Sequence, residues 1–265
     1  MPLLKALGAH SVSSVLNAIA GWLWSNLIHF GGQLFTDLVL APVNWAQAAS
    51  ALYVLSRNLA WAVSGVLLVW ALLRAMWPEL GDNSGGHAPA VVLHRAIAAA
   101  LITGGGLYAV QGLLAINNAI VAELGGVKLG HAQWAGSALT LSPLFALVAA
   151  AVLVALLFYL GVFYALRTIE IFLLTALLPW LAVWWIQSAD DSLLRNAARE
   201  LLAAIFIQSL HAGAFWLFVR LAGTGGSSLA TPFEAVGVLW YMTKLPEQFR
   251  RLLGTGGRAA FWPWR

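Results

Sequence analysis

The chain has 265 residues, of which 61% are hydrophobic and only 9% are charged. A soluble globular domain carries about 45–50% apolar and about 25% charged residues, so this composition excludes an ordinary soluble fold and predicts an all-α integral membrane protein. The net charge is +4, from 14 basic and 10 acidic residues. In a membrane protein this basic excess is mainly a topology signal, because Lys and Arg gather in cytoplasmic loops. The chain has no cysteine, which excludes disulfides, thiolate metal sites and cysteine nucleophiles.

Residues 1–50 form an N-terminal segment that is amphipathic rather than clearly membrane-spanning. Its apolar residues recur at three- and four-residue spacing while Ser and Asn lie elsewhere on the helical wheel, a pattern typical of an amphipathic helix. We expect this helix to lie in the membrane interface or to pack on a neighbouring subunit. Gly31 and Gly32 are expected to end it, and Pro42 to precede the next helix. The apolar set is Val12, Val15, Leu16, Ile19, Trp22, Leu23 and Leu27.

Residues 51–222 are predicted to form a polytopic transmembrane domain, because a membrane span needs roughly 20 apolar residues to cross about 30 Å of hydrocarbon. The run Gly104-Gly105-Gly106 inside it favours a kink or a close helix contact. Residues 223–265 are predicted to form an interfacial helix, at about 233–253, and a basic cytoplasmic tail. We expect about five spans, at about 51–76, 91–120, 143–166, 168–187 and 199–222.

The apolar stretch 143–187 contains the ionisable residues Arg167 and Glu170 near its middle. It allows two interpretations: two spans joined by a charged turn, or one helix of about 45 residues and about 68 Å. No Gly or Pro marks a turn at Arg167. With five spans, however, most basic residues fall on one side of the membrane, which predicts an outside N-terminus and a cytoplasmic C-terminus. The charge distribution therefore favours two spans, since a single span would move the basic C-terminus outside.

Ionisable and polar residues inside apolar helices are costly, so each one raises a functional question. Arg167 and Glu170 are three residues apart and can pair on one helix face, either lining a channel or subunit contact or as an interfacial charge pair. Gln208 and His211 share a face of a later helix. They can line a pore or relay protons, or they can serve as hydrogen-bonding contacts between helices.

Two further charged groups have simpler interpretations. Asp190 and Asp191 precede an apolar run and are predicted to cap the start of its helix. The C-terminal sequence FRRLLGTGGRAAFWPWR mixes Arg with Phe and Trp. It is typical either of a contact with anionic lipid or nucleic acid or of a topology anchor with interfacial aromatic residues. The candidate contact residues are Arg250, Arg251, Arg258 and Arg265.

The sequence contains none of the motifs that commonly carry catalysis or nucleotide binding. Its six histidines show no HExxH spacing, and there is no GxSxG elbow and no phosphate-binding loop. The triple glycine follows no strand pattern, so it is not a dinucleotide fingerprint. We therefore expect a protein that is not an enzyme, with no cofactor and no metal site.

The central region resembles a known family. The segments YALRTIEIFLLTALLPWLAVWW, SADDSLLRNAARELL and FIQSLHAGAFWL resemble the TrbL-type polytopic inner-membrane subunits of type IV secretion and conjugation systems. The likeness covers about residues 140–222 and is one of hydropathy and spacing. The chain lacks the large extramembrane loop that some members have. The positions that match the family pattern are Arg167, Glu170, Pro179, Arg199 and Gln208.

The resemblance implies a non-catalytic channel or scaffold subunit in the bacterial plasma (inner) membrane. It implies a homo-oligomer that works beside the ATPases and other subunits of a secretion system, with DNA or protein as the substrate in transit. Two other interpretations stay open from the residues alone. One is a secondary transporter, although no internal repeat is evident. The other is a structural or assembly membrane protein of a phage or cell envelope.

Overall fold

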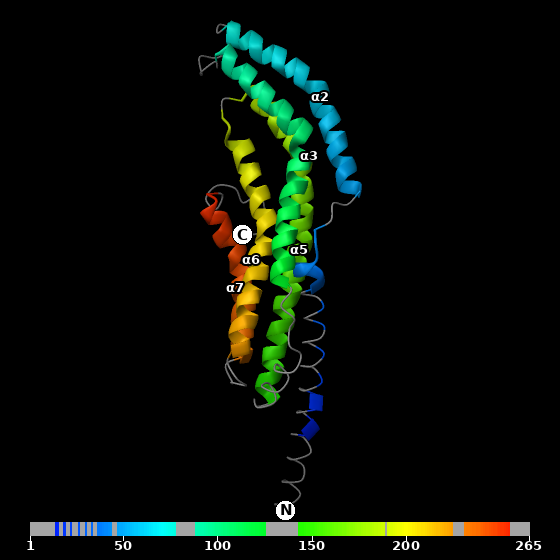
Figure 1. Ribbon diagram of the computed structural model, residues 1–265, viewed down its shortest axis with the longest axis vertical. Coiled ribbons are helices and arrows are strands. Elements are labelled where there is room, and N and C mark those ends of the chain that lie inside the picture. Colours follow the sequence, from blue (N-terminus) through cyan, green and yellow to red (C-terminus); the bar gives the residue numbers. More distant parts are fainter. Residues whose placement is uncertain are drawn as a thin grey trace, which may run out of the picture. The chain divides into compact units, whose positions relative to one another are not determined.

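The structure, a computed structural model, is built of helices. It describes residues 14–15, 18–19, 22, 26, 30, 33, 36–43, 47–77, 88–125, 143–188, 190–224 and 231–254. The described residues contain no strand, which confirms the predicted all-α class (Figure 1). The elements are the π-helix η1 (Thr36–Leu40) and the helices α2 (Gln47–Met76), α3 (Pro89–Gly125), α5 (Pro143–Trp185), α6 (Ser192–Thr224) and α7 (Thr231–Leu252).

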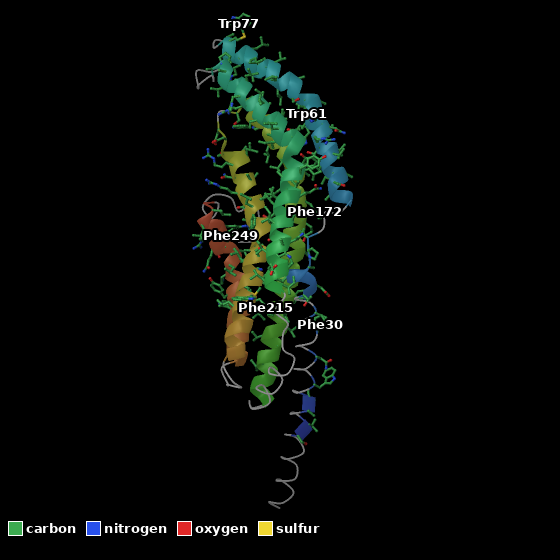
Figure 2. The ribbon with its side chains drawn as sticks, in the orientation of Figure 1. Phe30, Trp61, Trp77, Phe172, Phe215 and Phe249 are labelled. Atoms are coloured by element: carbon green, nitrogen blue, oxygen red, sulfur yellow. The ribbon has the colours of Figure 1, made fainter. Side chains whose placement is uncertain are left out.

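Four of the described helices contain segments that are long and apolar enough to cross a membrane. They confirm the membrane class that the composition predicted. The aromatic residues Trp61 and Trp77, on α2 and just beyond its end, are about half exposed (Figure 2), as expected where a helix meets lipid and headgroups. The four segments are Ala49–Met76, Pro89–Gly125, Val154–Trp185 and Ser192–Leu217.

The predicted break at Arg167 and Glu170 is wrong, because α5 is one continuous helix of 43 residues from Pro143 to Trp185. The physical reason is local. The residues from Arg167 to Glu170 contain no Gly or Pro, and nothing in their chemistry ends a helix. The prediction of two spans relied on membrane thickness and loop charge. The alternative of one long helix is the one that the structure contains.

The other predicted elements agree with the structure where residues are described. The described positions 14, 15, 18, 19, 22, 26, 30 and 33 of the N-terminal segment are helical, while the predicted break at Gly31 and Gly32 lies outside the described residues. Helix α7 covers nearly all of the residues, about 233–253, at which a helix was predicted. The tail beyond Gly254 lies outside the described residues.

The chain divides into two compact units, and α3, α5, α6 and α7 each contribute residues to both. Unit 1 consists of Met1–Pro42, Ala119–Leu166 and Ile207–Gln248. Unit 2 consists of Val43–Asn118, Arg167–Phe206 and Phe249–Arg265.

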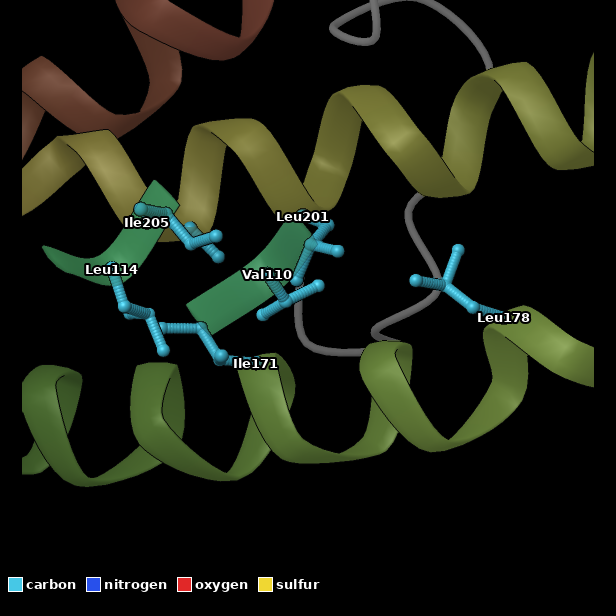
Figure 3. Packing of buried hydrophobic residues seen from close by; sticks show 7 residues of the cluster. Val110, Leu114, Ile171, Leu178, Leu201 and Ile205 are labelled. Carbon is cyan, nitrogen blue, oxygen red and sulfur yellow. The ribbon is translucent and has the colours of Figure 1, made fainter. Parts of the chain in front are cut away.

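Unit 2 is held by small and branched apolar side chains between α2, α3, α5 and α6. Figure 3 shows the central cluster, where Val110 and Leu114 of α3 meet Ile171 and Leu178 of α5 and Leu201 and Ile205 of α6. Towards the end where α2 is followed by α3, the cluster is made of Ala71, Val92, Ala99, Ala182 and Ile186. Alanine at these contacts lets helix backbones approach closely, which is how helices associate in lipid.

The triple glycine of α3 provides one close contact, as its sequence predicted. A Cβ on Gly106 would lie 3.3 Å from the hydroxyl of Tyr53, so a larger residue would press on that group. The Tyr53 hydroxyl donates to the Thr103 carbonyl at 3.0 Å and accepts from the Leu107 N–H at 3.2 Å, which ties α2 to α3. Gly104 and Gly105 face open space.

Candidate functional site

In unit 1, the side chain of Gln208 donates hydrogen bonds to backbone carbonyls at the end of η1. The π-helix η1 ends at Leu40, so the carbonyls at its end have no following helical N–H to accept from. The side-chain amide of Gln208 is fully buried and donates to the carbonyls of Val39 and Ala41, each at 2.8 Å. An unpaired carbonyl in an apolar environment costs several kcal/mol, so this contact is structural.

In unit 2, the side chain of Asn118 forms hydrogen bonds with the backbone of Val43, the residue that follows Pro42. Its side-chain oxygen accepts from the Val43 N–H at 3.2 Å, and its amide donates to the Val43 carbonyl at 3.4 Å. Sequence reasoning missed this residue. A signal was present, since Pro42 predicted a break in the helix, and a break inside apolar sequence needs polar side chains nearby.

His211 is fully buried in unit 1 between helices α5 and α7. Its Nε2 lies 2.9 Å from the Met242 carbonyl, and its Nδ1 lies 2.9 Å from the hydroxyl of Tyr164. A carbonyl can only accept, so Nε2 carries a hydrogen and donates to Met242. The Tyr164 hydroxyl is the hydrogen-bond partner of Nδ1, so both ring nitrogens are used.

The reason that Met242 needs a donor lies four residues further along α7, at Pro246. Proline has no N–H, so the carbonyl four residues before it loses its helical hydrogen bond. That carbonyl is the one to which His211 donates. His211 thus makes the kind of interhelical hydrogen bond that was one of the two interpretations of the sequence.

Arg167 is almost fully buried and donates to two backbone carbonyls of α6. Its Nε donates to the carbonyl of Ala204, and its NH2 group donates to that of Ile205 at 2.9 Å. A carbonyl oxygen has two lone pairs, so it can accept from Arg167 and from its own helix together. Arg167 therefore fastens α5 to α6 within unit 2.

Glu170 lies one turn further along α5 and pairs with Arg250. The NH2 group of Arg250 lies 2.7 and 2.9 Å from the two carboxylate oxygens of Glu170. The Nε of the same guanidinium lies 3.0 Å from a carboxylate oxygen of Glu200 on α6. All three side chains are at most one-quarter exposed. One arginine thus bridges two acidic residues and binds the end of α7 to α5 and α6.

One of the four arginines expected to contact lipid or nucleic acid, Arg250, takes part in these ion pairs. The guanidinium of Arg250 is turned towards two carboxylates of its own chain. Arg251 is exposed beside it. Arg258 and Arg265 lie outside the described residues. Helix α7 ends just beyond this point, at Leu252. Two residues later, Gly254 has a φ of 76°, a left-handed conformation that glycine adopts readily.

The start of α6 confirms the predicted helix cap. The carboxylate of Asp190 accepts from the Ser192 N–H at 2.9 Å and from the Ser192 hydroxyl at 2.5 Å. The Asp191 carbonyl accepts from the Arg195 N–H at 3.0 Å, and the side chains of these two residues form an exposed ion pair. Acidic groups here also favour the positive end of the helix dipole.

We predict that this cap weakens in acid. The hydrogen bonds from the Ser192 hydroxyl and N–H hold the pKa of Asp190 below its ordinary value. A depressed folded-state pKa gives stabilisation that is present above about pH 3.9, the unfolded value, and is lost as pH falls through the folded value. Protection of the Ser192–Arg195 amides, measured as the ratio of the intrinsic to the observed exchange rate, is therefore expected to fall in acid more in the wild type than in Asp190→Ala. Equal responses in the two proteins would contradict the prediction.

The described residues contain no group of three His, Asp or Glu side chains placed to hold a metal ion. The polar residues with contacts given above bond to backbone or to one another, and this arrangement links helices within each unit. No protein-family model, no curated protein and no solved structure matches the chain. On its own evidence the chain is an all-α membrane protein with four described helices able to span a bilayer.

Proposed function

We propose that the protein is a non-catalytic scaffold and channel-forming subunit of a type IV secretion apparatus in the bacterial inner membrane, and that it works as a homo-oligomer. The resemblance of residues 140–222 to TrbL-type subunits supports the proposal that the apparatus is a type IV secretion system. The exposed apolar surface of α5 supports the homo-oligomer, and it is the main structural observation behind the proposal. Other subunits of the system, including its ATPases, would supply the energy, and DNA or protein would be the substrate.

The exposed apolar stripe of α5 is longer than a bilayer is thick. Apolar side chains more than one-third exposed recur along the helix from Val148 to Trp184. At 1.5 Å per residue this stripe is about 54 Å long, and even a tilt of about 40° leaves it spanning about 41 Å. The hydrocarbon core is only about 30 Å thick. The remaining apolar length needs protein to cover it, and further copies of the chain or partner subunits can supply that cover.

The buried polar residues favour a passage between copies over a passage inside one copy. Arg167, Gln208 and His211 are each at most 2% exposed and donate to carbonyls of neighbouring elements. A side chain used in this way holds helices together and is not free to line an aqueous path. Substrate would therefore pass through a channel enclosed by several subunits.

The continuity of α5 changes the topology that we propose. One crossing by α5 gives four spans and places the start of α2 and the end of α6 on the same side of the membrane. Helix α7 then runs back along α6, because Arg250 near the end of α7 pairs with Glu200 near the start of α6.

The test is to purify the tagged protein in a mild detergent from a host that carries its transfer or secretion system. We expect an oligomer by native mass spectrometry, co-purification of a secretion ATPase, and loss of transfer when the gene is deleted. A monodisperse monomer without such an ATPase, together with unchanged transfer in the deletion strain, would overturn the proposal. Uptake of a solute by the purified protein in proteoliposomes would favour a secondary transporter instead.

A further inference from the structure

Unit 1 carries an open apolar groove between the N-terminal segment and α5. The groove has a volume of about 500 Å³ and is lined by Phe30, Gln33, Asp37, Leu157, Phe158, Gly161, Val162 and Ala165. Phe158 is 72% exposed, and the small residues Gly161 and Ala165 leave room on the floor of the groove. The acidic group on its wall is Asp37, which forms no ion pair with any residue that the structure describes.

The same unit presents a face of α7 with the opposite charge. Trp240 and Tyr241 are about half exposed, and Lys244 is exposed one turn beyond Trp240. The Lys244 ammonium lies 5.3 Å from the centre of the Trp240 ring, a cation–π distance that holds the amine against the aromatic surface. We call Trp240, Tyr241 and Lys244 the α7 face.

The groove and the α7 face lie at about the same height along α5 within unit 1. Val39 of η1, Leu160 and Tyr164 of α5, and Met242 of α7 belong to one buried cluster. Asp37 is two residues from Val39, and Lys244 is two residues from Met242. In the view of Figure 1, η1 (blue) and α7 (orange to red) lie on opposite sides of α5 and α6.

We propose that the α7 face of one copy docks in the groove of the next copy, with Lys244 paired to Asp37. Copies in a membrane share one orientation, and a rotation about the membrane normal keeps every residue at its own depth. A contact between two different surfaces at the same depth can therefore repeat from one copy to the next within the membrane plane, and it forms a ring where the rotation between copies closes. The aromatic side chains fill the apolar floor, and the lysine meets the carboxylate. This inference rests on the proposed homo-oligomer and identifies its interface.

Cross-linking between two tagged copies tests the inference directly. The chain has no cysteine, so Asp37→Cys and Lys244→Cys each introduce a single thiol. The two variants carry different tags, are co-expressed, and are treated in membranes with a short bismaleimide. We expect a cross-linked dimer that carries both tags. Neither variant expressed alone should give a comparable dimer, because the contact joins two different surfaces.

A matched control uses Val148→Cys, which is exposed on the same helix as the groove. Val148 lies 13 residues, or about 20 Å, from Gly161 along α5, and it should not cross-link to Lys244→Cys. Efficient cross-linking by this control, or by Asp37→Cys alone, would overturn the inference. Failure of the Asp37–Lys244 cross-link while native mass spectrometry still finds the oligomer would overturn the interface and leave the proposed function standing. A monomer would overturn both.

Charge exchange gives a second measurement that does not depend on thiol chemistry. Asp37→Lys and Lys244→Asp each place like charges together, which should weaken self-association more than about tenfold. The double variant restores opposite charges and should recover most of the association. Both positions are exposed, so folding should be preserved and can be checked by circular dichroism. A double variant no better than the singles would contradict the pairing.

Discussion

Arg250→Ala is expected to be among the most destabilising single substitutions in the chain. It would leave Glu170 and Glu200 facing each other without the guanidinium that bridges them. Removing one partner of a fully buried ion pair costs about 3–5 kcal/mol. These side chains keep 20–25% of their exposure, so we expect a smaller loss, of about 2–3 kcal/mol. The measurement is the unfolding midpoint in detergent, by circular dichroism on heating and by titration with sodium dodecyl sulfate.

The chain provides controls that separate loss of the bridge from loss of a side chain. Adding Glu170→Gln to Arg250→Ala removes the repulsion between the two carboxylates, so the double variant should be more stable than Arg250→Ala alone. Arg250→Lys keeps the charge but lacks the planar fork that binds two carboxylates, and it should fall in between. Arg251→Ala, at the exposed neighbouring arginine, should change the midpoint little. Equal losses for Arg250→Ala and Arg251→Ala would argue against the bridge.

His211→Ala is the second substitution with a large expected effect. It opens a cavity among buried side chains and leaves the Met242 carbonyl without the donor that Pro246 fails to supply. We expect a loss of about 3 kcal/mol or more, from the cavity together with the unpaired carbonyl. His211→Gln can place an N–H near the position of Nε2 and should lose less. His94→Ala, at an exposed histidine of α3, is the matched control and should have little effect.

A double-mutant cycle with Pro246→Ala tests the cause of this loss. The substitution restores a backbone N–H four residues after Met242, and that N–H could donate to the Met242 carbonyl along α7. In the Pro246→Ala background, His211→Ala should cost about 1–3 kcal/mol less than in the wild type, the usual cost of an unsatisfied buried acceptor. The same cost in both backgrounds would mean that His211 does not serve the Met242 carbonyl.

The membrane class and most helices could be predicted from the sequence because they depend on local properties. Apolar length, the pattern of Asp190 and Asp191 before an apolar run, and the absence of strand signals are all local. The division of α5 was predicted wrongly because membrane thickness was given more weight than helix chemistry. Nothing at Arg167 ends a helix, and the structure follows that local rule.

The contacts of the candidate site could not be predicted, because they depend on the register between helices. The sequence places Glu170 three residues from Arg167 but does not show that Arg250, 80 residues later, lies beside it. Pro246 predicts that the Met242 carbonyl needs a donor, yet it does not identify His211. Such partners become visible only when α5, α6 and α7 are packed together.

The Arg250 bridge has a consequence for how the chain is made. Glu170 and Glu200 leave the ribosome before Arg250, so both acidic groups enter the bilayer region without their counter-ion. Synthesis proceeds at about 5–20 residues per second, which leaves them unpaired for seconds. Arg250, on the last described helix, therefore supplies the counter-charge for acidic residues of α5 and α6, which are synthesised earlier. A chain interrupted before Arg250 keeps two carboxylates without the guanidinium that bridges them.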